Sequence, residues 1–181
     1  MTSLLLIDIQ NDYFPGGRMA LHEPERAATH AAALLAHFRE RAWPVVHVRH
    51  VATEPYATFF LPNTEGAEIH SSVAPVAGEP VVVKQYPNSF LSTNLRDHLA
   101  GEDTSLVIAG MMTHMCVDST VRAASDLGFT CVVVADACAT CDQSYDGTTV
   151  GAPQVHAAFL AALNGTFASV ESAARVLARV A

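Results

Sequence analysis

Apolar residues along this chain form two alternating patterns, short continuous runs and longer stretches with helical spacing. The runs are rich in Val, Ile and Leu and have the length of strands, and the helical stretches fall between them. Strands are expected at residues 3–9, 44–51, 80–84, 105–110, 129–136 and 166–170, and helices at 24–42, 92–100, 115–128, 152–165 and 171–180. Residues 52–79 contain Pro, Gly, Thr and Glu without a sustained period, which predicts a long surface loop.

Continuous apolar strands are typical of a parallel sheet that is buried on both faces. Their alternation with helices predicts one doubly wound α/β domain over residues 1–181. In such a sheet, ligands bind beyond the carboxyl ends of the strands. The strand assignment places Asp8, Lys84, residues 110–116 and Asp136 at that edge.

Composition and charge narrow the classes of partner. Half of the 181 residues are hydrophobic and 15% are charged, which predicts a well-filled core. No apolar stretch reaches the roughly 20 residues of a membrane span, and Asp8 interrupts the N-terminal run too early for a signal peptide, so a cytoplasmic location is expected. The net charge of -8, without a Lys/Arg cluster, argues against nucleic acid and leaves small-molecule substrates and protein partners.

The four cysteines, Cys116, Cys131, Cys138 and Cys141, are expected to be free thiols. The spacing of Cys138 and Cys141 matches a redox motif or half of a zinc site, but a second such pair is absent from the sequence. Two small, partly buried thiols are the alternative. The sequence also has no Gly-x-Gly-x-x-Gly and no Walker lysine motif, so no nucleotide cofactor is expected.

Cys116 lies where a helix is expected to begin, and three residue types at the sheet edge suit nucleophilic catalysis. Unpaired amides and the helix dipole stabilise a thiolate at a helix start, and Lys84 would lower the pKa of the thiol further. Asp8 could take the thiol proton and return it to a leaving group. Taken singly, each residue also fits an ordinary role: a small buried hydrophobe, a solvent-exposed lysine, and a turn or cap residue.

Three motifs resemble the isochorismatase-like cysteine hydrolases. They read "LLIDIQNDYFPGG", "VVVKQYPNSF" and "VIAGMMTHMCVDSTVRAASDLGF" and lie within residues 4–129. The resemblance implies a three-layer αβα fold with a six-stranded, mostly parallel sheet. It also implies a catalytic triad of Asp8, Lys84 and Cys116. No cofactor is expected.

The same resemblance concerns the backbone before the cysteine. It implies a cis peptide bond between Met111 and Met112, although neither residue is proline. The backbone N–H groups of Met112 and Cys116 are then the candidates for an oxyanion hole.

Metal binding is not expected. Relatives that hydrolyse nicotinamide carry an Asp-x-His pair and a later His, whereas this chain has His47, His50 and His70 without that pair. On a strand, His47 and His50 would face opposite sides because their separation is odd. Nicotinamide is therefore not the expected substrate, and the retained thiol favours acyl transfer from an amide or a related C–N bond.

The long loop and its neighbours offer candidates for the substrate pocket. The expected pocket residues are Phe14, Phe59, Phe60, Phe90 and His114. Core or subunit-interface packing is the alternative for these side chains, and the loop could complete a neighbour's pocket in a homodimer or homotetramer. The competing functions are vinyl ether hydrolysis, which can dispense with the thiol, non-catalytic binding on the same fold, and thiol redox chemistry at Cys138 and Cys141.

Overall fold

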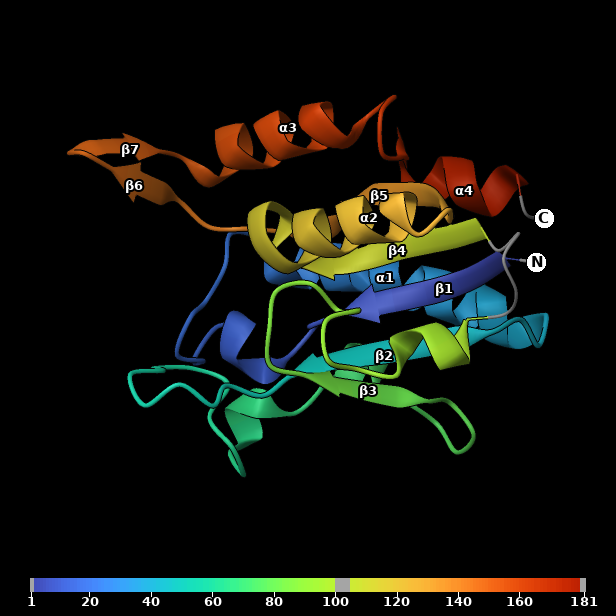
Figure 1. Ribbon diagram of the computed structural model, residues 1–181, viewed down its shortest axis with the longest axis horizontal. Coiled ribbons are helices and arrows are strands. Elements are labelled where there is room, and N and C mark those ends of the chain that lie inside the picture. The colour runs from blue at the N-terminus through green and yellow to red at the C-terminus, as the bar shows by residue number, and fades with distance from the viewer. Residues whose placement is uncertain (1, 100–104, 180–181) are drawn as a thin grey trace.

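The computed structural model describes residues 2–99 and 105–179, and its centre is a six-stranded sheet (Figure 1). The strands are β1 (Thr2–Ile7), β2 (Val45–His50), β3 (Val81–Lys84), β4 (Ser105–Met111), β5 (Thr130–Ala139) and β8 (Ser169–Glu171). Their order is β3-β2-β1-β4-β5-β8, and all neighbours pair in parallel. The helices are α1 (Pro24–Glu40), α2 (Asp118–Asp126), α3 (Ala152–Leu163) and α4 (Ala173–Arg179).

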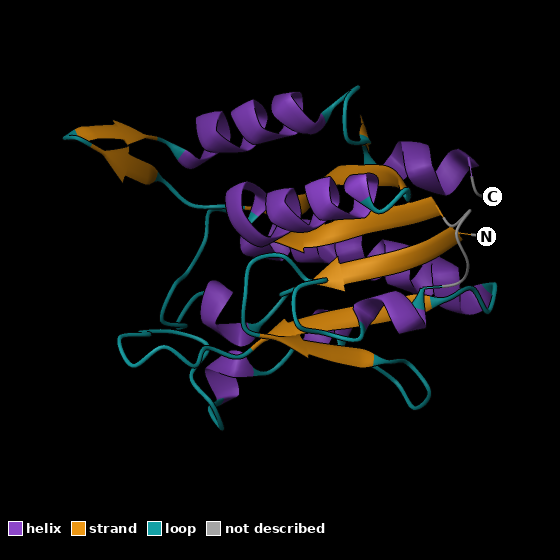
Figure 2. Ribbon diagram, viewed as in Figure 1, coloured by secondary structure: helices purple, strands orange, loops and turns teal. Residues whose placement is uncertain are grey.

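Helices cover both faces of the sheet, so the molecule has the three layers expected (Figure 2). Side chains of β1 alternate between two apolar cores. Leu4 and Leu6 pack in the core that contains α1 and α4, and Leu5 and Ile7 pack in the core that contains α2 and α3. The predicted α/β class and the parallel sheet are therefore confirmed.

The strand order reverses between β1 and β4, and this reversal positions the site. The chain runs outward from β1 through β2 to β3, and it then returns to place β4 on the other side of β1. Gly110 of β4 lies opposite Ile7 with φ at +153°, and a Cβ atom at Gly110 would collide with the Ile7 carbonyl oxygen. Glycine thus permits the close approach of the two segments that leave the sheet at this point.

Two expected elements differ from the structure. In place of a helix at 92–100 there is a 3-10 turn at Leu95–His98. The Thr93 hydroxyl donates to the Ser89 carbonyl and accepts from the Leu95 N–H, and such local bonds compete with a helix. Residue 100 of that helix and residue 180 of the last expected helix lie outside the described residues.

The fifth strand is longer than expected, which corrects the placement of Asp136. β5 runs on to Ala139, so Asp136 lies within the strand and not at its carboxyl end. Its carboxylate accepts a hydrogen bond of 2.7 Å from the Ala173 N–H at the start of α4. Asp136 therefore stabilises a helix terminus and is not part of the edge that carries the site.

An unexpected hairpin projects from the body of the molecule (Figure 1). It consists of β6 (Gln143–Tyr145) and β7 (Thr148–Val150), joined by Asp146 and Gly147. Both turn residues have positive φ, +48° and +73°, as a type I′ turn requires, so the Asp-Gly pair was the available sequence signal. In the described part of the chain, no helix has both the length and the apolar character needed to cross a membrane.

Candidate active site

Three segments deliver the predicted carboxylate, lysine and thiol to one edge of the sheet. Asp8 follows β1 directly with φ at +52°, a left-handed conformation uncommon for a residue with a side chain. Lys84 is the last residue of β3. Cys116 lies in a π-helical turn, Thr113–Val117, which connects β4 to α2. The helical segment thus begins before the expected residue 115, and Cys116 is its fourth residue.

The three side chains meet in the interior. The Lys84 Nζ lies 2.7 Å from Asp8 Oδ2 and 3.2 Å from Cys116 Sγ. The side chains of Asp8 and Lys84 are 0% exposed, and Cys116 is also buried. The structure therefore brings together the cation, carboxylate and thiol, although the sequence places them far apart.

His50, the last residue of β2, is a further neighbour of the lysine. Its Nδ1 lies 3.0 Å from Lys84 Nζ. The buried side chain of Gln10 holds the histidine backbone, because its Oε1 accepts from the His50 N–H and its Nε2 donates to the carbonyls of His50 and Ala67. Sequence reasoning missed Gln10, which is the first residue of the polar run that follows the apolar residues of the first strand.

The pKa of Cys116 departs from the expectation of a low-pKa thiolate. Burial and, after it, the carboxylate of Asp8 raise the pKa of the thiol, and Lys84 offsets only part of that rise. The charges of Asp8 and Lys84 compensate each other, so an ionised sulfur would add an uncompensated charge to a desolvated site. The raised pKa favours the protonated thiol form of Cys116 at neutral pH.

One group of described residues offers ligand atoms for a metal ion. Atoms of Asp8, His50 and Cys116 lie within 4.8 Å of one another. The Lys84 ammonium contacts all three residues, so a cation bound there would have to displace it. These donor atoms suit the Lys84 ammonium, and a metal ion would add a second positive charge beside it. The absence of a catalytic metal stays a prediction.

The other two histidines of that segment lie elsewhere. His47 faces away from His50, as the strand period predicts, and its Nε2 lies 2.9 Å from Glu79 Oε2. His70 stacks on Phe14 with ring centroids 3.7 Å apart. The three histidines considered as metal ligands are therefore not gathered in one place.

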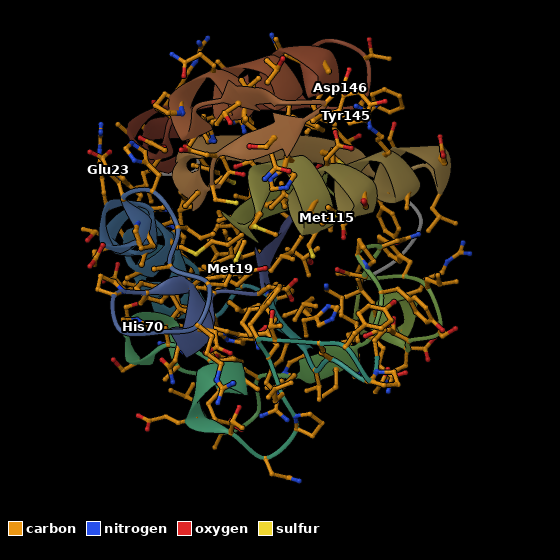
Figure 3. All side chains as sticks on the ribbon, turned by 90° about the vertical axis from the view of Figure 1, so that its left-hand side faces the viewer. Met19, Glu23, His70, Met115, Tyr145 and Asp146 are labelled. Carbon is orange, nitrogen blue, oxygen red and sulfur yellow. The ribbon has the colours of Figure 1, made fainter. Side chains whose placement is uncertain are left out.

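A cavity of about 370 Å³ opens onto Cys116. Its apolar wall includes Tyr13, Met19, Phe59, Phe60, Met112 and Met115, and its polar side chains are His50, His114 and Gln143. Figure 3 looks at this edge and shows Met19 and Met115 near the middle of the view, below the hairpin tip. The volume is in the range of small-molecule sites.

The predicted pocket residues divide between this wall and the core. Phe59, Phe60 and His114 line the cavity. Phe14 and Phe90 do not, which corrects their assignment: Phe14 stacks on a histidine as described, and Phe90 stacks on Phe129 at 5.9 Å between ring centroids. Aromatic partners within the protein satisfy both rings, and period and composition could not reveal that pairing.

The loop wall is anchored by a buried carboxylate that sequence reasoning missed. Asp12 accepts hydrogen bonds from the N–H groups of Phe60, at 2.7 Å, and Arg18, at 3.1 Å. Phe60 has φ at +54°, so the loop turns sharply where Asp12 holds it. This contact fixes the aromatic wall of the cavity relative to β1.

The spaced cysteine pair does not share one pocket. All four cysteines are free. Cys141 lines the cavity at Cys116, whereas Cys138 lines a separate cavity of about 460 Å³ between α1 and α3. Two thiols that open to different cavities give little support to a redox pair.

The chain is similar to known proteins along most of its length. A family model described as the isochorismatase domain matches residues 2–175. The uncharacterized isochorismatase family protein YddQ of Bacillus subtilis is 54% identical over 172 residues, which cover 94% of this chain and 96% of the relative. The nicotinamidase of Escherichia coli is 30% identical, with 75% of this chain and 82% of the relative covered.

A solved structure is similar along almost the whole chain. It belongs to a protein of Oleispira antarctica described as an isochorismatase hydrolase, and it superposes with a TM-score of 0.94 at 52% identity. The match covers 98% of this chain and 96% of the other. Fold and sequence thus point to one family.

Proposed function

Because this chain belongs to the isochorismatase family of hydrolases, we propose that it is a cysteine-dependent amidase that acts on a small-molecule amide or a related C–N bond. The observation that supports this best is the contact of one ammonium group, that of Lys84, with both the Asp8 carboxylate and the Cys116 sulfur beside a cavity. A nucleophile, a base and a compensating cation are the groups that acyl transfer needs.

The proposed reaction begins with the neutral thiol. Asp8 takes the proton of Cys116 as the sulfur attacks the carbonyl carbon, and the Lys84 ammonium compensates the charge that develops nearby. The N–H groups of Met112 and Cys116 are the proposed donors to the oxyanion. Asp8 then passes its proton to the departing nitrogen, which leaves an acyl thioester on the sulfur.

Hydrolysis of the thioester completes the cycle. Asp8, again a carboxylate, removes a proton from a water molecule that attacks the thioester carbonyl. The carboxylic acid product leaves, and the sulfur regains a proton. The same carboxylate thus serves once as base and once as acid in each half of the cycle, the second time by returning its proton to the sulfur.

Other functions on this fold predict different observations. A vinyl ether hydrolase does not need the thiol, whereas here the thiol contacts the lysine. A non-catalytic binding protein gives no reason to bury an acid, a lysine and a cysteine in contact. A cytoplasmic location and a homo-oligomeric assembly belong to the same proposal.

The test is a screen for ammonia release over small primary amides and ureides, with lactams assayed by mass spectrometry for the ring-opened amino acid, run beside the Cys116→Ala variant. We expect release with at least one amide and none with the variant. Rapid quenching of a slow substrate should place the acyl group on the peptide that contains "THMCVDST". Ammonia release that persists in the variant would refute the thioester route.

A further inference from the structure

We propose that His50 binds the substrate through its Nε2–H and that the cavity selects uncharged amides over charged ones. This inference rests on the proposed amidase function and adds a binding residue and a substrate class to it. It is carried by the contacts of His50 and by the charges of the cavity wall.

The contact with Lys84 determines which ring nitrogen of His50 holds the proton. An ammonium group has three N–H donors and no acceptor. At 3.0 Å from Nζ, the Nδ1 of His50 must therefore accept, and the ring proton lies on Nε2. Burial and, after it, the charge of Lys84 lower the pKa of His50, so the ring is neutral at neutral pH.

The Nε2–H group is free to meet a ligand. Among the residues that the structure describes, none makes a hydrogen bond with it, and His50 lines the cavity beside Cys116. The ring is also held in place, because Gln10 clamps the backbone on both sides and the Phe60 ring packs 5.9 Å away. A fixed neutral donor near the sulfur suits the oxygen of an uncharged group.

The cavity wall offers no charge to a charged ligand. No Asp, Glu, Lys or Arg occurs among the described residues that line it. Burial lowers the pKa of His114, so this second ring is neutral as well. Asp8 and Lys84 neutralise each other behind the sulfur. A carboxylate or ammonium on the substrate would lose hydration without a compensating partner, which is costly.

A matched pair of alkylating reagents tests the charge preference without a known substrate. Iodoacetamide and iodoacetate carry out the same reaction, but only iodoacetate has a carboxylate. The measurement is the rate of labelling of the Cys116 peptide, with glutathione as the reference thiol at the same pH. We expect the preference for iodoacetamide at Cys116 to exceed that of glutathione by at least about tenfold, which corresponds to about 1.4 kcal/mol.

Two variants separate the two ring nitrogens. The oxygen of His50→Asn can replace Nδ1 as acceptor but leaves no donor at Nε2, whereas the amide of His50→Gln can replace the donor and leaves Lys84 without its acceptor. We expect iodoacetamide to bind more weakly before labelling in His50→Asn. In His50→Gln the binding should be retained and the pH profile of labelling should shift. The exposed His98→Asn is the matched control.

The outcomes distinguish this inference from the amidase proposal. If Cys116 and glutathione prefer iodoacetamide over iodoacetate to the same degree, or if iodoacetate labels Cys116 faster, the cavity does not select uncharged ligands. Labelling in both His50 variants that equals that of the unmodified protein would overturn the role of the ring. If Cys116 shows the expected preference for iodoacetamide but the protein hydrolyses no amide, the amidase function is rejected and the binding inference stands.

Discussion

The buried ion pair between Asp8 and Lys84 makes a quantitative prediction about stability. Both side chains are fully buried and their charged atoms are 2.7 Å apart. Removing one member of such a pair leaves an uncompensated charge in the interior and typically costs about 3–5 kcal/mol. Asp8→Asn and Lys84→Met are close in shape to the native residues, so each should lower the free energy of unfolding by about this amount.

The cost translates into a measurable change in melting temperature. For a chain of this length, 1 kcal/mol corresponds to about 2–4 °C, so each single variant should melt about 6–20 °C lower. The double variant removes both charges, and replacing a whole buried pair is often close to neutral. We therefore expect it to recover most of the loss, which gives a strongly non-additive double-mutant cycle.

The assay is urea or thermal unfolding at neutral pH. This pH is chosen because the contribution of Lys84 to the free energy of unfolding depends on pH. Burial lowers the pKa of Lys84, but its contacts with the Asp8 carboxylate and the Cys116 sulfur outweigh that effect, so the folded pKa lies above the ordinary value. The stabilisation from such a group is fully present at a pH below its pKa in the unfolded chain. It is lost as the pH rises through the pKa in the folded protein. If the double variant loses the sum of the two single losses, the charges do not act as a pair and the reasoning fails.

Three further predictions concern the site and its support. Dialysis against a chelator should leave turnover unchanged, and a loss restored by added zinc, iron or manganese would contradict the ammonium assignment. Burial and Asp8 raise the pKa of Cys116, so iodoacetamide should label Cys116 more slowly than glutathione at neutral pH, and the rate should increase with pH. Fast labelling that is independent of pH would indicate a resting thiolate. Gly110→Ala should destabilise the protein by about 1–3 kcal/mol and reduce activity, because the new methyl group collides with Ile7; unchanged melting would show that β1 and β4 tolerate separation.

The fold was largely predictable because buried parallel strands leave a strong pattern. Runs such as residues 105–110 are apolar on both faces, and helices of ordinary length separate them. The expected helix at 92–100 was wrong because hydroxyl side chains near Thr93 form local bonds that hydrophobic period does not report. The hairpin escaped notice because its strands have only three residues each.

The candidate site was predictable in part for a related reason. Asp8, Lys84 and Cys116 could be placed from strand ends alone, since parallel strands share one carboxyl edge. Their mutual burial, and the high thiol pKa that follows from it, depend on distances that a sequence does not contain. The roles of Gln10 and Asp12 depend on contacts with a loop more than 40 residues away.

The central position of β1 in the sheet has a consequence for how the chain folds. The first strand to be synthesised pairs with β2 and with β4, whose residues follow it by roughly 40 and 100 positions. One edge of β1 therefore stays unpaired until residue 111 has been made, and pairings of this range form slowly. An N-terminal fragment that ends before β4 would expose one edge of β1 and should aggregate, so the thiol and its base come together only in a chain that has completed most of its sheet.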